Sequence, residues 1–157
     1  MSECELTIGV ISDTHGLLRP QAVAAMRGTD LIIHAGDVGN RDIVKALADI
    51  APTFAVRGNV DTATWAADLP ATELVKVGER LFFVLHQISE LDFDPAAAGF
   101  AAVVFGHSHK PLIETREGVL YLNPGSAGPR RFDLPVAVAR VAVSSEHLHP
   151  EIVELRV

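Results

Sequence analysis

Short apolar runs that each end in a polar cluster are the feature that most constrains this chain. The runs are rich in β-branched and aromatic residues, which predicts buried strands. In sheets built from alternating strands and helices, ligands collect outside the carboxyl ends of the strands, so we expect the clusters to meet at one edge. The clusters are Asp13-Thr14-His15, Gly36-Asp37, Gly58-Asn59, His86 and Gly106-His107-Ser108-His109.

The first part of the chain alternates predicted strands with predicted helices. Strands are expected at residues 6–11, 31–35 and 54–57, and helices at residues 20–26 and from 41 to about 51. Pro20 is tolerated in a first helical turn, Asn40 is a suitable N-cap, and Pro52 ends the second helix. This alternation favours a parallel sheet and an α/β fold.

Hairpins replace helices after Asp61. Residues 62–71 are expected to form a loop, and residues 87–101 an irregular segment. Strand pairs are predicted at 73–77 with 80–85 and at 112–115 with 119–122, because each pair flanks a short turn that contains glycine. Further strands are predicted at 102–105, 135–143 and 151–157, and residues 1–157 are expected to form a single domain.

The composition is that of an ordinary globular protein. Hydrophobic residues make up 48% and charged residues 21% of the sequence, and no apolar stretch approaches the ~20 residues that a membrane span needs. The net charge of -7 argues against a general nucleic-acid or membrane-surface binder. Cys4 is the only cysteine, and Glu3 precedes only a short apolar run, so we expect no disulfide, no signal peptide and a cytoplasmic location.

Two histidines one residue apart follow the apolar run that ends at Gly106. If the backbone stays extended through Ser108, His107 and His109 point to the same side, where they could serve two metal ions ~3.5–4 Å apart. The alternative is a pair of surface histidines in a loop. The metal site is favoured because four of the seven histidines lie in clusters that follow predicted strands.

The clusters together supply two carboxylates, one amide oxygen and four imidazoles. Nitrogen and oxygen donors without thiolate favour manganese, iron, cobalt, nickel or zinc. Two such ions carry a charge of about +4, and two carboxylates with a bridging hydroxide carry about -3. The site therefore keeps a positive charge that suits a phosphate. A hydroxide acidified by both ions is the expected nucleophile, since no serine or cysteine with a paired base is evident.

In this order, Asp-x-His, Gly-Asp, Gly-Asn, a strand-end His and Gly-His-x-His resemble the motifs of the calcineurin-like metallophosphoesterases, over about residues 6–130. The stretch Val-Arg-Gly-Asn-Val-Asp at residues 56–61, and Asn123-Pro124-Gly125-Ser126 followed by Pro129-Arg130, look closer still to the small YfcE-type phosphodiesterases. That subfamily also includes the retromer subunit, which is a protein scaffold. The resemblance implies a four-layer α/β/β/α sandwich of two mixed sheets, with a dimetal site at one end.

The resemblance also implies a role for each cluster. One ion would be held by Asp13, His15, Asp37 and His109. The other would be held by Asp37, Asn59, His86 and His107, with Asp37 as the bridge. Manganese is the expected metal, with nickel, iron, cobalt and zinc as alternatives. Catalytic roles are assigned to Asp37, Asn59 and Asp61, and substrate contacts to Asn59 and Arg130.

Two positions depart from the family pattern. Many members carry a histidine, thought to protonate the leaving group, directly after the Gly-Asn asparagine, but this chain has Val60 and then Asp61. Asp61 either assists this step or caps the loop, and substrates with acidic leaving groups are expected to be favoured. After His86 the family usually has glycine, whereas this chain has Gln87, which is expected to narrow the pocket or shift His86.

Other polar residues carry their own predictions. Arg130 and Arg131 either reach a substrate phosphate or form a solvated basic pair. We expect His34 to be a hydrogen-bonded core histidine, and His147 and His149 to lie at the surface.

The predicted function is therefore that of a metal-dependent phosphodiesterase that hydrolyses a small phosphate ester. The alternatives are a phosphomonoesterase that uses the same site and a non-catalytic protein-binding scaffold like the retromer subunit. A nucleic-acid substrate is not expected, since no basic stripe is present. Pairing of subunits through the hairpins near a sheet edge is left open.

Overall fold

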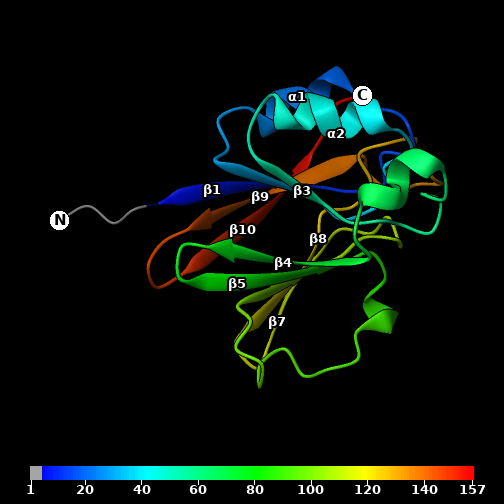
Figure 1. Cartoon of the computed structure of the whole chain (residues 1–157). Coiled ribbons are helices and arrows are strands. Elements are labelled where there is room, and N and C mark those ends of the chain that lie inside the picture. Colours follow the sequence, from blue (N-terminus) through cyan, green and yellow to red (C-terminus); the bar gives the residue numbers. More distant parts are fainter. Residues whose placement is uncertain (1–4) are drawn as a thin grey trace.

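Two five-stranded sheets form the framework of the computed structural model, which describes residues 5–157 (Figure 1). Their strand orders are β10-β9-β1-β2-β3 and β4-β5-β6-β8-β7. Both sheets mix parallel and antiparallel neighbours, which confirms the predicted α/β class with two mixed sheets. Cys4 and Glu3, which support the expected absence of a disulfide and of a signal peptide, lie outside the described residues.

The first sheet follows the predicted alternation of strands and helices. Its strands β1 (Leu6–Ile11), β2 (Leu31–His34) and β3 (Thr53–Ala55) are parallel neighbours. The helices α1 (Pro20–Met26) and α2 (Arg41–Ala48) connect these strands and cover the outer face of the sheet (Figure 1). The parallel arrangement brings the carboxyl ends of the three strands to one edge.

Both helices begin where the sequence predicts. Pro20 is the first residue of α1, and the Asn40 side chain caps α2 by accepting a hydrogen bond from the Ile43 N–H at 3.2 Å. The end of α2 comes three residues before the predicted limit. The Asp49 N–H still bonds to the Lys45 carbonyl, but the Ile50 N–H bonds to the Leu47 carbonyl only three residues earlier and tightens the last turn. The helices pack on the sheet through buried side chains that include Ala22, Met26, Ile32, Ile43 and Leu47.

The second sheet contains the two predicted hairpins. The pairs β4–β5 and β7–β8 are antiparallel, whereas β6 is parallel to both β5 and β8. The carboxyl ends of β5 and β6 therefore reach the same edge. The strands are β4 (Thr72–Val77), β5 (Arg80–Leu85), β6 (Ala102–Val104), β7 (Leu112–Arg116) and β8 (Val119–Asn123).

The outer face of the second sheet is covered by residues 87–101. This segment contains the short 3-10 helix η2 (Ile88–Glu90) and a turn at residues 95–99, and no α-helix. Phe93 and Phe100 pack edge-on against Phe83 of β5, with ring centroids 4.9 and 5.5 Å away. The fourth layer of the sandwich is thus the predicted irregular segment, held in place by aromatic contacts.

The main core lies between the two sheets. Ile8 and Val10 of the first sheet belong to the same buried cluster as Phe82, Val84 and Leu122 of the second. Full burial of one such side chain stabilises the fold by about 1.5–3 kcal/mol. This core fixes the two sheets relative to each other, and with them the loops at their ends.

The chain ends in a hairpin whose second strand starts earlier than predicted. The strands β9 (Ala137–Val143) and β10 (Leu148–Glu154) are antiparallel, and β10 is an edge of the first sheet. The predicted start at residue 151 is wrong, because a tight turn closed by the Ser144 N–H and the His147 carbonyl, 2.9 Å apart, lets pairing resume at once. Pro150 is tolerated because an edge strand leaves one side unpaired.

The remaining helical segment is short. Residues 62–71, predicted as a loop, contain the 3-10 helix η1 (Thr64–Asp68). Within residues 5–157, no helix has the length and apolar character needed to cross a membrane.

Candidate metal centre

Loops from both sheets meet at one edge of the sandwich. Asp13 follows β1 and Asp37 follows β2 in the first sheet, whereas His86 follows β5 and His109 follows β6 in the second. The expected convergence of clusters at strand ends is confirmed for these residues. Their ligand atoms form two groups, each within 4.8 Å: Asp13, His15 and His109, and Asp13, Asp37 and His86.

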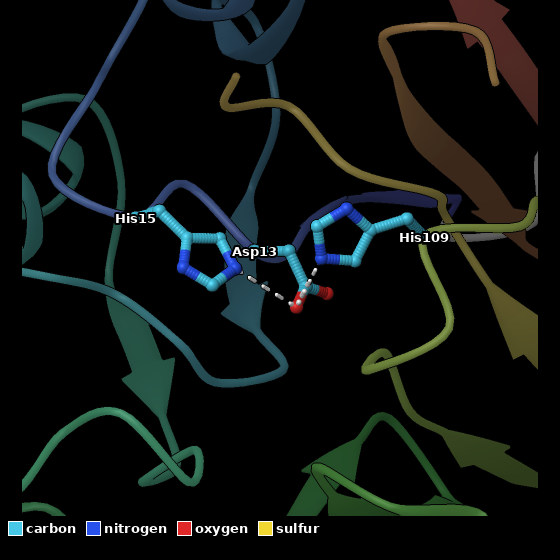
Figure 2. Close-up of side chains that lie close together, drawn as sticks. All are labelled: Asp13, His15 and His109. Atoms are coloured by element: carbon cyan, nitrogen blue, oxygen red, sulfur yellow. Dashed lines mark ion pairs between the residues drawn. The ribbon is translucent and has the colours of Figure 1, made fainter. Parts of the chain in front are cut away.

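Asp13 lies at the centre of the first group (Figure 2). Its Oδ1 is 3.3 Å from His109 Nε2 and 3.6 Å from His15 Nε2. Its Oδ2 accepts hydrogen bonds from the Ser12 hydroxyl at 2.6 Å and from the His107 backbone N–H at 3.1 Å. One carboxylate oxygen is thus bound by the protein, while the other faces two imidazoles.

Asp37 connects the first group to the second. Its Oδ2 lies 3.5 Å from His15 Nε2 and 3.2 Å from His86 Nε2. Its Oδ1 accepts a hydrogen bond from the Val60 N–H at 3.0 Å. Asp37 therefore lies between imidazoles that the resemblance assigns to different ions. Asp13 Oδ1 is also 3.8 Å from His86 Nε2, so the two groups form one continuous cluster.

The backbone holds the His86 ring in one orientation. Its Nδ1 lies 2.7 Å from the Ala35 carbonyl oxygen, so Nδ1 carries the proton and donates it to that oxygen. In the neutral ring, Nε2 then presents its lone pair to the cluster. The His86 Nε2 lies 3.2 Å from Asp37 Oδ2, and Gln87 is among the residues that line the adjacent cavity. Both effects expected of Gln87, a narrower pocket and a shifted His86, stay predictions.

The Asn59 amide faces the second group. Its inward atom lies 3.1 Å from His86 Nε2 and 3.2 Å from both carboxylate oxygens of Asp37. That atom is the amide oxygen, and all of its neighbours are acceptors. Such an arrangement is favourable with a cation among these atoms, or after a rotation that puts the amide NH₂ in this position.

The backbone is not extended at the two histidines of the last cluster. His107 and His109 have φ angles of 72° and 65°, and the Ser108 N–H donates to the Gly106 carbonyl at 2.9 Å, which closes a tight turn around His107. The His109 ring lies beside that of His15 and the His107 ring beside that of His86, each pair with centroids 5.3 Å apart. The condition of an extended backbone through Ser108 is therefore not met. His107 is exposed and lies outside both compact groups.

Five of the predicted ligands have a backbone conformation that residues with side chains rarely adopt. Such a conformation costs on the order of 1–3 kcal/mol and persists only where the surrounding structure enforces it, often at functional sites. Within residues 5–157, seven non-glycine residues have a positive φ, and five of them are Asp13, His15, Asp37, His107 and His109.

The electrostatics of the cluster favour ionised carboxylates. Burial alone would raise the pKa of Asp13, but contacts with His109 and His15 hold that pKa well below its usual range. Burial also acts against ionisation of Asp37, and its contact with His86 lowers the Asp37 pKa. Burial would lower the His86 pKa, yet the contact with Asp37 raises it above its usual value. The cluster thus attracts positive charge.

Three buried polar atoms of the described residues lack a hydrogen-bond partner, one each on Asp13, His15 and His109. The Asp13 and His15 atoms face each other in the cluster, whereas His109 faces Asp13 with its other nitrogen, Nε2. A buried polar atom without a partner costs about 1–3 kcal/mol. Carboxylate and imidazole donors that converge in this way are typical ligands of divalent transition metals. The residues present therefore fit a metal ion. The three atoms are Asp13 Oδ1, His15 Nε2 and His109 Nδ1.

Asp61 caps the loops next to the cluster. Its side chain is 4% exposed, and its Oδ2 accepts hydrogen bonds from the N–H groups of Val38 and Gly58 at 3.0 and 2.9 Å. Its Oδ1 accepts a third, from the Gly39 N–H at 3.0 Å. Both oxygens are engaged with the backbone, so these contacts support the capping interpretation and not the assignment of Asp61 to leaving-group protonation.

The loop that carries Arg130 starts against the first group. The backbone of Gly128 packs so closely on the carbonyls of Asp13 and Thr14 that a side chain would not fit there. Arg19 Nε and Nη2 donate to the Gly128 carbonyl, both at 3.3 Å. Arg130 follows two residues later and is exposed, and its role in substrate binding stays a prediction.

Sequence reasoning missed two residues that hold the ligands in place. Ser12 anchors Asp13, and Asn123 Nδ2 donates to the Gly106 carbonyl at 3.1 Å and to the Ser108 hydroxyl at 3.2 Å. A signal existed for Asn123, which ends an apolar strand just as the ligands do. For Ser12 the only signal was its position next to Asp13.

His34 is the buried core histidine that the sequence predicts. Its Nδ1 accepts a hydrogen bond from the Gly36 N–H at 3.1 Å, so the neutral ring carries its proton on Nε2, which lies 3.0 Å from Thr14 Oγ1. Burial lowers the pKa of His34 to about 4. The neutral ring thus supports the loops that carry the ligands.

A sandwich of two mixed sheets that gathers carboxylates, imidazoles and an amide at one edge defines the class of metallophosphoesterases. Residues 6–146 match the family model described as "Calcineurin-like phosphoesterase superfamily domain". The chain belongs to this family of metal-dependent phosphoesterases.

Two curated relatives match over most of their length. The chain is 34% identical over 161 residues to the "Probable metallophosphoesterase" of Methanothermobacter thermautotrophicus, an alignment that covers 94% of this chain and 92% of the relative. It is 28% identical over 139 residues to "Phosphodiesterase YfcE" of Escherichia coli, with coverage of 73% and 76%.

Solved structures share the fold at lower identity. Vacuolar protein sorting 29 from Cryptosporidium parvum has a TM-score of 0.84 at 21% identity. The alignment covers 97% of this chain and 92% of that protein's chain. The phosphoesterase YfcE from Escherichia coli has a TM-score of 0.68 at 20% identity, with coverage of 96% and 100%. At these identities the likeness shows the fold alone.

Proposed function

We propose that this chain is a phosphodiesterase that hydrolyses a small phosphate ester at two divalent metal ions. The observation that carries the proposal is the position of Asp37, whose Oδ2 lies between His15 and His86, the imidazoles assigned to different ions. When bound, the two ions would supply Lewis-acid charge for the phosphate and an acidified water as the nucleophile.

The ligand sets overlap at Asp37. Asp13, His15, Asp37 and His109 would hold one ion. Asp37, Asn59, His86 and His107 would hold the other. Manganese is the metal to test first, followed by nickel, iron, cobalt and zinc, because the same donors accept several of these ions.

The protein groups around the ligands orient them and receive the substrate. The Ser12 hydroxyl holds Asp13, and the Ala35 carbonyl fixes the tautomer of His86. The Asn59 amide, exposed beside the second group, both ligates and faces the substrate. Arg130 binds the phosphate from the loop that starts on the Asp13 backbone.

The site offers no evident general acid for the leaving group. The Asp61 carboxylate accepts three backbone N–H groups, and Val60 cannot carry a titrating proton. Esters whose leaving alcohol is acidic depart without protonation, so they are expected to react faster than alkyl esters.

Two rival functions use the same fold. A phosphomonoesterase is separated from a diesterase by comparing both rates in one enzyme preparation. A protein-binding scaffold is suggested by the likeness to vacuolar protein sorting 29, but all seven proposed ligand positions are filled in this chain. The curated name of the relative YfcE, a phosphodiesterase, favours the diesterase.

The test is manganese-dependent hydrolysis of bis-p-nitrophenyl phosphate, a diester with an acidic leaving group. Asp37→Ala is expected to lower kcat/KM at least about 1,000-fold, because its carboxylate contacts both halves of the cluster. Asp92→Ala, which removes an exposed carboxylate elsewhere, is expected to keep the wild-type rate.

Metal analysis of the purified protein completes the test. About two ions per chain in the wild type, and fewer in Asp37→Ala, would support the dimetal site. Wild-type inactivity with all five metals, or monoester rates far above diester rates, would contradict the proposal.

A further inference from the structure

A cavity of about 170 Å³ opens beside the proposed metal centre. Two of the proposed ligands, Asn59 and His86, form part of its wall. A group in this cavity would therefore lie next to a phosphate bound at the metal centre. The other lining residues are Arg57, Gly58, Ala71, Gln87 and Glu90.

Three residues with polar side chains, Arg57, Gln87 and Glu90, are among those that line the rest of the cavity. The Arg57 guanidinium offers N–H donors, the Gln87 amide offers donors and an acceptor, and the Glu90 carboxylate offers only acceptors. Gln87 and Glu90 belong to one turn, since the Glu90 N–H donates to the Gln87 carbonyl at 3.0 Å. The backbone of Arg57 is fixed by its N–H, which donates to the Pro70 carbonyl at 2.8 Å.

The size of the cavity limits what it can hold. Liquid water takes about 30 Å³ per molecule, so the cavity has room for roughly five or six waters. An alcohol of about three to six carbons fits this space. Mixed donors and acceptors match hydroxyl groups, which both donate and accept.

We propose that Arg57, Gln87 and Glu90 form a specificity pocket that receives a hydroxyl-bearing alcohol of the phosphate ester, such as a polyol or a sugar. This inference rests on the proposed function, because it needs the phosphate to bind at the metal centre.

Alternative occupants fit the lining less well. An alkyl or phenyl group would take water from the three polar side chains without replacing its hydrogen bonds, and sites built for hydroxyl groups reject analogues that lack them. A second phosphate would meet the Glu90 carboxylate. A hydroxyl-bearing group supplies acceptors for the Arg57 guanidinium, donors for the Glu90 carboxylate and both for the Gln87 amide.

The test compares two phosphate monoesters of equal carbon number, glycerol 1-phosphate and propyl phosphate. Each is measured as a competitive inhibitor of bis-p-nitrophenyl phosphate hydrolysis by the manganese-loaded protein. Glycerol phosphate is expected to bind about tenfold more tightly than propyl phosphate or phenyl phosphate, because only its hydroxyl groups pair with the pocket.

Glu90→Ala and Gln87→Ala are expected to reduce this ratio to about two or less by weakening only glycerol phosphate. Asp92→Ala is the matched control, since it removes an exposed carboxylate from the same segment outside the pocket and should keep the full ratio. Inorganic phosphate, measured in every variant, reports on the metal centre alone.

The outcomes separate this inference from the function on which it rests. If inorganic phosphate inhibits but glycerol and propyl phosphate bind equally, or if the variants keep the ratio, the pocket proposal is overturned and the phosphodiesterase stands. If no hydrolysis occurs, the proposed function fails. Titration calorimetry with the same two phosphates then gives the ratio without turnover, and a ratio near one overturns the pocket as well.

Discussion

Asp61 binds three backbone N–H groups from two different loops, those of Val38, Gly39 and Gly58. These loops carry Asp37 and Asn59, so the carboxylate positions two proposed ligands without touching the metal centre. The single side chain thus links the end of β2 to the end of β3.

Replacing Asp61 tests this positioning role. Asp61→Ala is expected to lower the free energy of unfolding by about 3 kcal/mol, since each unpaired buried N–H costs roughly 1–3 kcal/mol and water relieves the exposed ones. Asp61→Asn keeps one acceptor oxygen and should lose about half as much. Urea unfolding measures both. If Asp61 were the general acid, Asp61→Asn would instead flatten the alkaline side of the kcat profile with little loss of stability.

His34 gives the apoprotein a specific pH dependence. Its folded pKa of about 4 lies below the ordinary 6.5, so the unfolded chain takes up a proton first as the pH falls. Titration of His34 therefore costs no stability above pH 6.5 and lowers the free energy of unfolding between pH 6.5 and 4, by about 3 kcal/mol in total. The lowered pKa values of Asp13 and Asp37 make the free energy of unfolding depend on pH only below pH 3.8. The raised pKa of His86 makes it depend on pH only above pH 6.5.

The measurement is urea unfolding of chelator-treated protein at several pH values. His34→Gln removes the titrating group, so its stability should change much less between pH 6.5 and 4. If the free energy of unfolding had the same pH dependence in the wild type and in His34→Gln, this assignment would be contradicted.

At the scale of single elements, the start of α2 depends on Asn40. Its side chain satisfies the Ile43 N–H, one of the groups that a helix start leaves unpaired. Asn40→Ala is expected to cost about 1 kcal/mol of unfolding free energy, while Asn40→Ser should keep most of it. Manganese-dependent hydrolysis should stay near the wild-type rate, because Asp61 holds the preceding loop. A cost below a few tenths of a kcal/mol would show that the cap is dispensable.

The elements that could be predicted from sequence are those with a local signal. The strands and helices from β1 to β3 follow from periodicity, Pro20 and Asn40, and both hairpins follow from their turns. The start of β10 could not be predicted, because its pairing depends on the turn after β9 and on its edge position, which tolerates Pro150. The left-handed turns at His107 and His109 depend on contacts with distant loops.

In the whole molecule, the proposed metal centre joins the two sheets. Asp13 and Asp37 extend from the first sheet, whereas His86 and His109 extend from the second. Ions held by both sets would cross-link the sandwich in its folded form only, so metal binding is expected to stabilise the fold.

Thermal unfolding with and without metal tests this coupling. At manganese concentrations about 100-fold above the dissociation constant, binding to the folded state alone adds about 2.7 kcal/mol per site, which raises Tm by several degrees. Asp37→Asn should lose most of this increment, and Asp92→Ala should keep it. An unchanged Tm for the wild type across the whole manganese titration would contradict the cross-link.

The sequence by itself determined the types of donor and their order along the chain, because strand and helix patterns and the residues that follow them are local properties. Only the tertiary structure decided which donors meet. The packing of two sheets around one core brings Asp13 Oδ1 within 3.8 Å of the His86 and His109 imidazoles, which come from two loops of the other sheet. It also engages Asp61 with backbone N–H groups. Such distances depend on contacts between residues far apart in the chain, which no local pattern encodes.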